Sequence, residues 1–100
     1  MNHTVEIIQA YVRGEIGLEE CNEKLAAVGS GTMLDPDRAK LTPEMIKEGW
    51  GLLDTGTGYL DPVLVKDMEL QNADCGEMVA FCFLMGKMYE VQGTKLVDLK

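Results

Sequence analysis

The spacing of β-favouring runs in the second half of the chain constrains the fold more than any other feature. Short runs rich in β-branched and aromatic residues, separated by Gly, Asp and Asn, predict strands at 59–65, 68–73, 77–85, 87–92 and 95–99. Neighbouring runs leave no room for crossover helices, so consecutive strands must be antiparallel. We therefore predict an antiparallel meander of four or five strands, which either lies flat under the first half of the chain or closes into a small barrel.

The first half of the chain has helical periodicity instead. Residues 4–13 and 18–28 carry apolar side chains three and four positions apart, and Gly14 and Gly29 stand where a left-handed residue can end each helix. Residues 29–41 are rich in Gly, Ser, Asp and Pro, which predicts a loop. This half therefore begins with a helical hairpin.

A short third helix is predicted directly before the β-rich half. Thr42 offers a capping hydroxyl, Pro43 suits the first helical position, and Glu44 places an acid in the first turn. Gly49 ends this helix within two turns. The predicted fold class is α+β: a helical hairpin, a short third helix, and then a flat sheet or a small barrel that resembles the SH3 type.

A single domain over residues 1–100 is expected, because 100 residues is the usual size of one domain. Its mainly helical part is 1–49 and its antiparallel β part is 50–100. The 17 acidic residues outnumber the 9 basic ones and give a net charge of −8. Lys and Arg dominate binding to nucleic acids and anionic membranes, so neither is an expected direct partner.

The cysteines and the terminus predict a cytoplasmic location. Cys21, Cys75 and Cys82 are odd in number and contain no C-x-x-C pair, which fits a reducing compartment. No secretory signal is evident, and the longest apolar run, Met78–Met85, has eight residues, too few to span a bilayer. We expect no metal site, since the fourth ligand would be His3 at a terminus, and no cofactor, since no glycine fingerprint has the context that cradles phosphate.

Two resemblances bear on the chain. The segment "IIQAYVRGEIGLEECNEKL" resembles the bacterial paired-helix module called SHOCT, although Gly17 stands where that module usually has a Ser or Thr cap; it implies a protein-interaction role. "GWGLLDTGTGYLDPV" and "NADCGEMVAFCFLMGKMYEVQGTKLV" resemble segments of small proteins of anaerobic gut bacteria and their mobile elements. This second resemblance implies the type of domain and no activity.

The segment Leu52-Leu53-Asp54-Thr55-Gly56-Thr57 is similar to the active-site turn of aspartic proteases. That similarity implies a homodimeric hydrolase in which Asp54 is catalytic and two like-charged carboxylates share one proton. The protease fold, however, needs strands before this turn, whereas residues 4–48 predict helices. A structural turn is the preferred interpretation, and the hydrolase is the alternative.

Three further residues are candidates for an interaction surface. Trp50 either anchors a partner or fills the junction of helix and sheet. Met85 and Met88 either form an adaptable binding surface or pack in the core.

The leading hypothesis for function is a non-catalytic protein-interaction module of a bacterial or mobile-element genome. The helical hairpin and an exposed edge of the meander would contact another protein or a second copy of the chain. Besides the Asp54 hydrolase, an acidic decoy that mimics nucleic acid is a further alternative. The decoy requires carboxylates in rows on one face.

Overall fold

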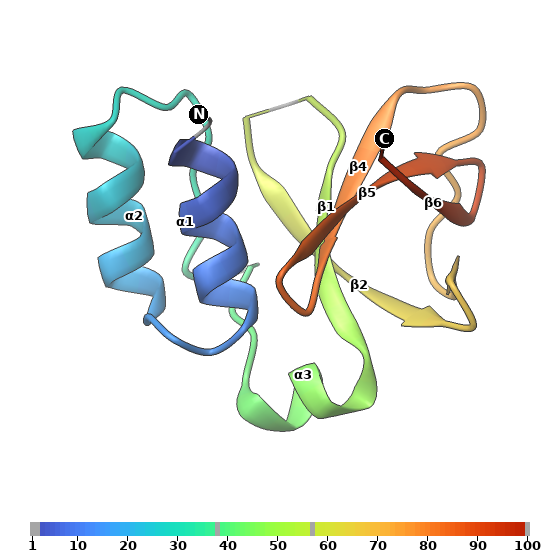
Figure 1. Cartoon of the computed structure of the whole chain (residues 1–100), viewed down its shortest axis with the longest axis horizontal. Coiled ribbons are helices and arrows are strands. Elements are labelled where there is room, and N and C mark those ends of the chain that lie inside the picture. The colour runs from blue at the N-terminus through green and yellow to red at the C-terminus, as the bar shows by residue number, and fades with distance from the viewer. Residues whose placement is uncertain (1–2, 38, 57, 100) are drawn as a thin grey trace.

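The computed structural model describes residues 3–37, 39–56 and 58–99. A helical hairpin lies on one side of a closed antiparallel barrel of six strands, and a short third helix lies below the barrel in Figure 1, which confirms the predicted α+β class and the barrel alternative. The helices are α1 (His3–Val12), α2 (Leu18–Ala27) and α3 (Pro43–Glu48). The strands are β1 (Trp50–Asp54), β2 (Leu60–Lys66), β3 (Glu69–Leu70), β4 (Ala80–Leu84), β5 (Lys87–Gln92) and β6 (Lys95–Asp98).

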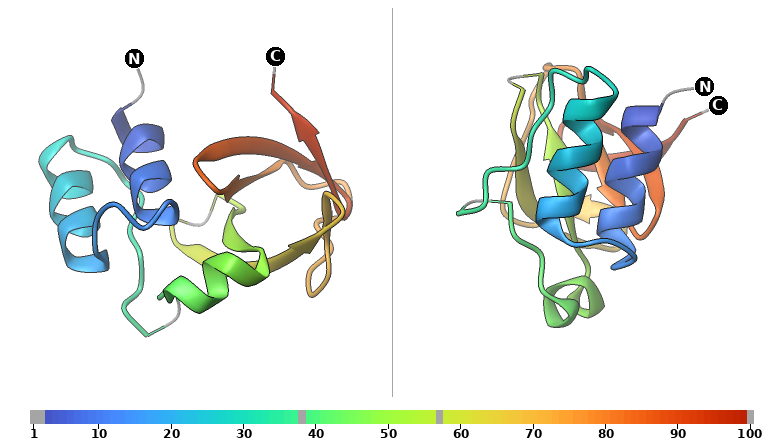
Figure 2. Two further views of the ribbon diagram at one scale, coloured as in Figure 1. Left: turned by 60° about the horizontal axis from the view of Figure 1, so that its bottom comes forward. Right: turned by 90° about the vertical axis from the view of Figure 1, so that its left-hand side faces the viewer.

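The predicted helical hairpin is confirmed, and glycine ends both of its helices. Gly14 takes a φ of 81°, its N–H donates to the carbonyl of Tyr11 at 3.0 Å, and the N–H of Glu15 donates to Ala10 at 2.9 Å. These two hydrogen bonds together form the Schellman motif, and Gly29 ends α2 in the same way. Viewed from the helical side, α1 and α2 lie side by side in front of the barrel (Figure 2).

The third helix forms as its capping sequence predicts. The hydroxyl of Thr42 accepts a hydrogen bond from the N–H of Met45 at 3.2 Å, and Pro43 occupies the first turn. Gly49 ends the helix with a φ of 102°. Its carbonyl accepts from the N–H of Val65 at 3.1 Å, so the end of α3 is joined to β2.

Strand β1 was not predicted, since the sequence indicated only a junction and a turn there. It pairs with β2 along its whole length and with β4 through Leu52–Asp54. Gly51 weakens the strand signal, yet the barrel requires it: an added Cβ would lie 2.3 Å from the carbonyl oxygen of Phe83. Tertiary proximity therefore selects a residue that local β propensity disfavours.

A simple meander would pair each strand with the next one in the sequence, and this prediction is wrong for β3 and β4. The barrel order is β1-β2-β3-β6-β5-β4, so β4 returns to pair with β1, and β3 pairs with β6 through Glu69 and Lys95. Two three-stranded meanders are thus joined in a Greek key. Closure also corrects the expected exposed edge, because each of the six described strands has neighbours on both sides.

The strand predicted at 77–85 is shorter than its apolar run. Only Ala80–Leu84 is β4, which lies between β1 and β5. Met78, Val79 and Met85 lie outside it and are 55%, 70% and 66% exposed. Apolar composition alone therefore overestimates how much of this run is buried.

Alternation along the strands creates two separate cores. On β1, Leu52 points to the helices and Leu53 points into the barrel; on β4, Phe83 and Cys82 divide in the same way. The helix-side core is formed by Ile8, Tyr11, Val12, Cys21, Leu25, Leu34, Ala39, Leu41, Leu52, Leu60 and Phe83. The barrel core is formed by Leu53, Val63, Val65, Leu70, Cys75, Ala80, Cys82, Val91 and Leu96.

Candidate functional site

A cleft lies between the helical hairpin and α3, and Tyr11 forms the link between its two walls. The Tyr11 hydroxyl donates to the carbonyl of Ala39 at 3.2 Å and accepts from the N–H of Leu41 at 2.8 Å. Burial raises the pKa of this phenol above its ordinary value of 10.0, and the hydrogen bond from Leu41 partly opposes that effect. The phenol therefore stays neutral and holds the loop before α3 against α1.

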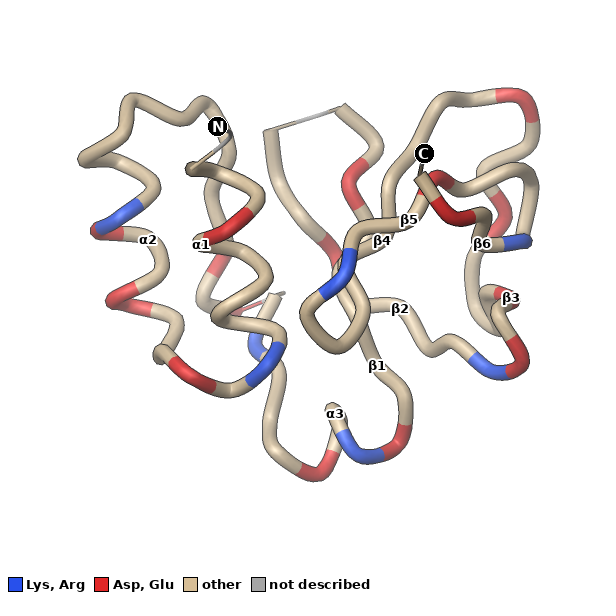
Figure 3. The backbone as a smooth tube through the Cα atoms, viewed as in Figure 1, with Lys and Arg blue, Asp and Glu red and all other residues tan. Residues whose placement is uncertain are grey.

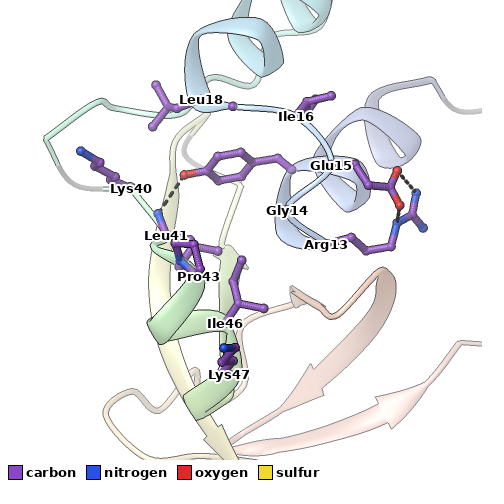
Figure 4. Close-up of a pocket in the computed structure, with 12 residues that line it drawn as sticks. Arg13, Gly14, Glu15, Ile16, Leu18, Lys40, Leu41, Pro43, Ile46 and Lys47 are labelled. Carbon is purple, nitrogen blue, oxygen red and sulfur yellow. Dashed lines mark hydrogen bonds and ion pairs between the residues drawn. The ribbon is translucent and has the colours of Figure 1, made fainter.

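The cleft has a volume of about 620 Å³, within the roughly 300–1,000 Å³ range of ligand pockets. Its lining consists of apolar side chains, the hairpin turn and four charged residues: Tyr11, Arg13, Gly14, Glu15, Ile16, Gly17, Leu18, Lys40, Leu41, Pro43, Ile46 and Lys47. Figure 4 shows Ile16 and Leu18 on one side of the cleft, with Leu41, Pro43 and Ile46 facing them. An apolar surface is thus open to a partner.

The charged residues of the cleft are mostly basic. Arg13 pairs with Glu15 through an Nε–Oε2 contact of 2.7 Å. Lys40 and Lys47 are exposed, and within the described ranges neither forms an ion pair. In Figure 4 Lys40 and Arg13 stand at opposite ends of the cleft. The lining therefore carries positive charge on a protein of net charge −8.

Arg13 is positioned by the barrel. A Cβ on Gly86 would lie 2.6 Å from Cδ of Arg13, so the arginine stem lies directly on the turn between β4 and β5. Its guanidinium reaches past this turn to Glu15. The cleft is thus built by the hairpin, by α3 and, through Arg13, by the barrel.

A second hollow of about 500 Å³ adjoins the cleft beside the start of α2. Gly17, Leu18 and Lys40 line both hollows, whereas Glu19 and Glu20 line only the second. The two ends of the combined surface therefore differ in charge. Lys40 marks the boundary between the basic end and the acidic end.

Asp54, the candidate catalytic residue, lies at the end of β1, next to Leu60 and Phe81 in the register. Its Oδ1 accepts a hydrogen bond from the N–H of Gly56 at 2.9 Å, so the carboxylate stabilises the turn that follows the strand. Thr57, the last residue of the motif, lies outside the described residues. Asp54 does not line the cleft.

None of the three interaction candidates lines the cleft. Trp50 is half-buried at the start of β1, and Met88 is half-buried on β5; both pack against the helix-side core. Met85 is exposed at the turn between β4 and β5, with a φ of 48°. Of the three, Met85 alone presents most of its side chain at the surface.

The three cysteines are buried free thiols. Burial raises the pKa of Cys21 to about 11 and, with a smaller contribution from Cys75, that of Cys82 to about 12. Burial and the nearby Asp74 also raise the pKa of Cys75. Thiols that stay protonated are poor nucleophiles and poor metal ligands, which indicates packing roles.

Metal clusters and membrane-spanning helices are both absent from the described part of the chain. No group of three His, Cys, Asp or Glu side chains there could hold a metal ion. No helix in the same ranges is both long enough and apolar enough to cross a bilayer.

Comparison with known proteins leaves the cleft without a precedent: no family model, no curated protein and no solved structure matches the chain. The cleft was also not predicted from the sequence. Its one local signal is the pair Ile16 and Leu18, apolar residues on either side of a turn glycine. The opposite wall, formed by Leu41 and Ile46, follows in the chain only after the long loop.

Proposed function

We propose that the chain is a non-catalytic protein-interaction module whose contact surface is the cleft between the helical hairpin and α3. The observation that supports it is an open apolar surface beside two lysines that have no ion pair within the described ranges. Surfaces that combine apolar area with oriented polar groups are typical of binding sites. The partner is another protein, because the closed barrel removes the strand edge that self-pairing would use.

We propose that the protein acts in the cytoplasm of a bacterial cell. Its gene would belong to a bacterial or mobile-element genome. Three protonated thiols support a reducing compartment. The acidic decoy is less well supported: acidic residues occur on the hairpin, on α3 and on the barrel turns, with basic residues among them (Figure 3). In this view they are spread over both halves of the described chain.

The proposal is tested by capture from a lysate of the source organism, with two matched variants of α3. Ile46 lines the cleft, whereas its neighbour Met45 does not; both are half-buried and both pack on the helix-side core. Ile46→Ser should therefore lose, by at least tenfold, proteins that the wild-type chain and Met45→Ser retain, as measured by quantitative mass spectrometry. Thermal unfolding of both variants verifies that they remain folded.

The proposal is wrong if no protein distinguishes Ile46→Ser from Met45→Ser. The same lysate tests the hydrolase alternative, because Asp54→Asn should leave the set of captured proteins unchanged. Cleavage of an unfolded substrate that disappears with Asp54→Asn would favour the hydrolase instead.

A further inference from the structure

The charge of the cleft differs from that of the chain as a whole. Three of the nine basic residues line it, namely Arg13, Lys40 and Lys47, together with a single acid, Glu15. Elsewhere acidic residues predominate, and the net charge is −8. Electrostatic complementarity steers partners and selects among them, so this local reversal of sign indicates the charge of the occupant.

The positive charge is available to a partner. Glu15 already pairs with Arg13, but the ammonium groups of Lys40 and Lys47 have no acidic partner within 4.0 Å among the described residues. A carboxylate brought to either lysine would form a new ion pair at an exposed site.

The apolar part of the cleft requires that the partner also bring apolar side chains. Ile16, Leu18 and Ile46 are each half-buried, so part of each side chain still faces solvent. An aliphatic side chain that covers these exposed parts would strengthen binding in proportion to the apolar surface removed from water. A purely charged partner would leave this surface uncovered.

This inference rests on the proposed function and specifies its partner. We propose that the cleft binds an acidic segment of a partner protein in which one or two large aliphatic side chains stand beside Asp or Glu. The aliphatic side chains cover Ile16 and Ile46, and the carboxylates pair with Lys40 and Lys47. Glu19 and Glu20 repel further acids at the other end, so the acidic residues of the segment lie on the Lys47 side of Lys40.

The test is selection from a random twelve-residue peptide library displayed on phage, with the whole folded chain immobilised. The wild-type chain should enrich peptides that combine Leu, Ile or Met with Asp or Glu. Lys40→Glu/Lys47→Glu should lose these peptides and enrich basic ones. Lys24→Glu/Lys66→Glu, which changes the net charge equally at exposed lysines outside the cleft and leaves Lys95 opposite Glu69, should enrich the same peptides as the wild type.

One enriched peptide then measures the strength of the effect by fluorescence anisotropy. Two exposed ion pairs are worth roughly a tenfold change in Kd together, so Lys40→Glu/Lys47→Glu should weaken binding by about that factor or more. Ile46→Ser should weaken it as well, and raising the salt concentration should weaken the wild type toward the level of the lysine variant.

The outcomes separate this inference from the function on which it rests. If the enriched peptides are neutral or basic and their binding depends on Ile46, the acidic partner is wrong and the interaction module stands. No enrichment by the wild-type chain would overturn the acidic segment, whereas the interaction module would still be decided by the lysate capture. Dodecanoate is the remaining probe. If it binds with the same dependence on Lys40 and Lys47 while no peptide is enriched, the cleft binds a lipid-like anion and the proposed acidic segment is wrong.

Discussion

The two cores of this protein are filled with side chains of different size. The helix-side core contains Tyr11, Phe83, Ile8 and five leucines, whereas the barrel core contains three valines, Ala80 and two cysteines among its nine residues. A barrel of six strands has a narrow interior, so small side chains fill it. A helix pair laid on a sheet leaves a wider gap, which large side chains fill.

This difference explains where a binding surface can form. The barrel closes on itself, and its interior is filled. The helix-side core is open at its margin, where the hairpin and α3 diverge and Tyr11 joins α1 to the loop before α3 through hydrogen bonds to Ala39 and Leu41. The cleft occupies that margin.

The strongest test of the barrel acts on its closure. Gly51→Ala places a methyl group against the backbone carbonyl of Phe83, which cannot move without opening β1 from β4. We expect a loss of about 3 kcal/mol or more in the free energy of unfolding, measured by urea denaturation. Gly31→Ala, where an added Cβ meets nothing within 4 Å, should change it by less than about 0.5 kcal/mol.

A matched pair of substitutions tests the difference in width. Cys82 lies in the barrel core and Cys21 in the helix-side core, and both are fully buried. Cys82→Leu should destabilise by about 3 kcal/mol, because overpacking a narrow interior forces strained rotamers. Cys21→Leu should cost about 1 kcal/mol, since adjacent helices can separate slightly. Equal losses in thermal unfolding would refute this account of the two cores.

The link between the cleft walls is tested by Tyr11→Phe. The variant keeps the ring in the core but leaves the N–H of Leu41 and the carbonyl of Ala39 without this partner. We expect the free energy of unfolding to fall by about 2 kcal/mol, because two buried backbone groups lose their hydrogen-bond partner. Hydrogen exchange should quicken at Leu41 and leave the barrel strands unchanged; uniform acceleration across the barrel would instead mean that the two cores unfold together.

A further expected effect is a dependence of the free energy of unfolding on alkaline pH. The unfolded thiols ionise near the ordinary pKa of 9.0, whereas the folded pKa values are about 11 for Cys21 and about 12 for Cys82. Between these values the unfolded chain releases protons that the folded chain retains, so stability is full below pH 9 and falls as the pH rises toward 12. Cys82→Ala should flatten this decline in urea titrations; an unchanged slope would assign it to other groups.

The parts of the fold that were predicted correctly depend on local signals. Thr42 and Pro43 start α3, and the glycines at 14 and 29 end α1 and α2, because capping and left-handed geometry act within a few residues. Strand β5 was predicted over its whole observed range, 87–92, since turns bound it closely on both sides.

The parts that were missed depend on contacts between distant residues. Gly51 weakens the local signal for β1, and the pairing of β3 with β6 joins Glu69 to Lys95 across the whole of β4 and β5. The walls of the cleft are joined by the hydrogen bond between Tyr11 and Leu41, which lie 30 residues apart in the chain. Asp54, Trp50, Met85 and Met88 were singled out for their residue types, which do not indicate where the open surface lies.

The sequence by itself determined that this chain is an acidic α+β protein with a helical first half and an antiparallel second half, because periodicity, capping and turn chemistry are local properties. Only the tertiary structure decided that the sheet closes in Greek-key order and that the hairpin and α3 diverge to leave an apolar cleft with lysines at its margin. Barrel closure and cleft shape depend on side-chain volumes and on backbone approaches such as that of Gly51 to Phe83. Such contacts exist only once distant segments meet.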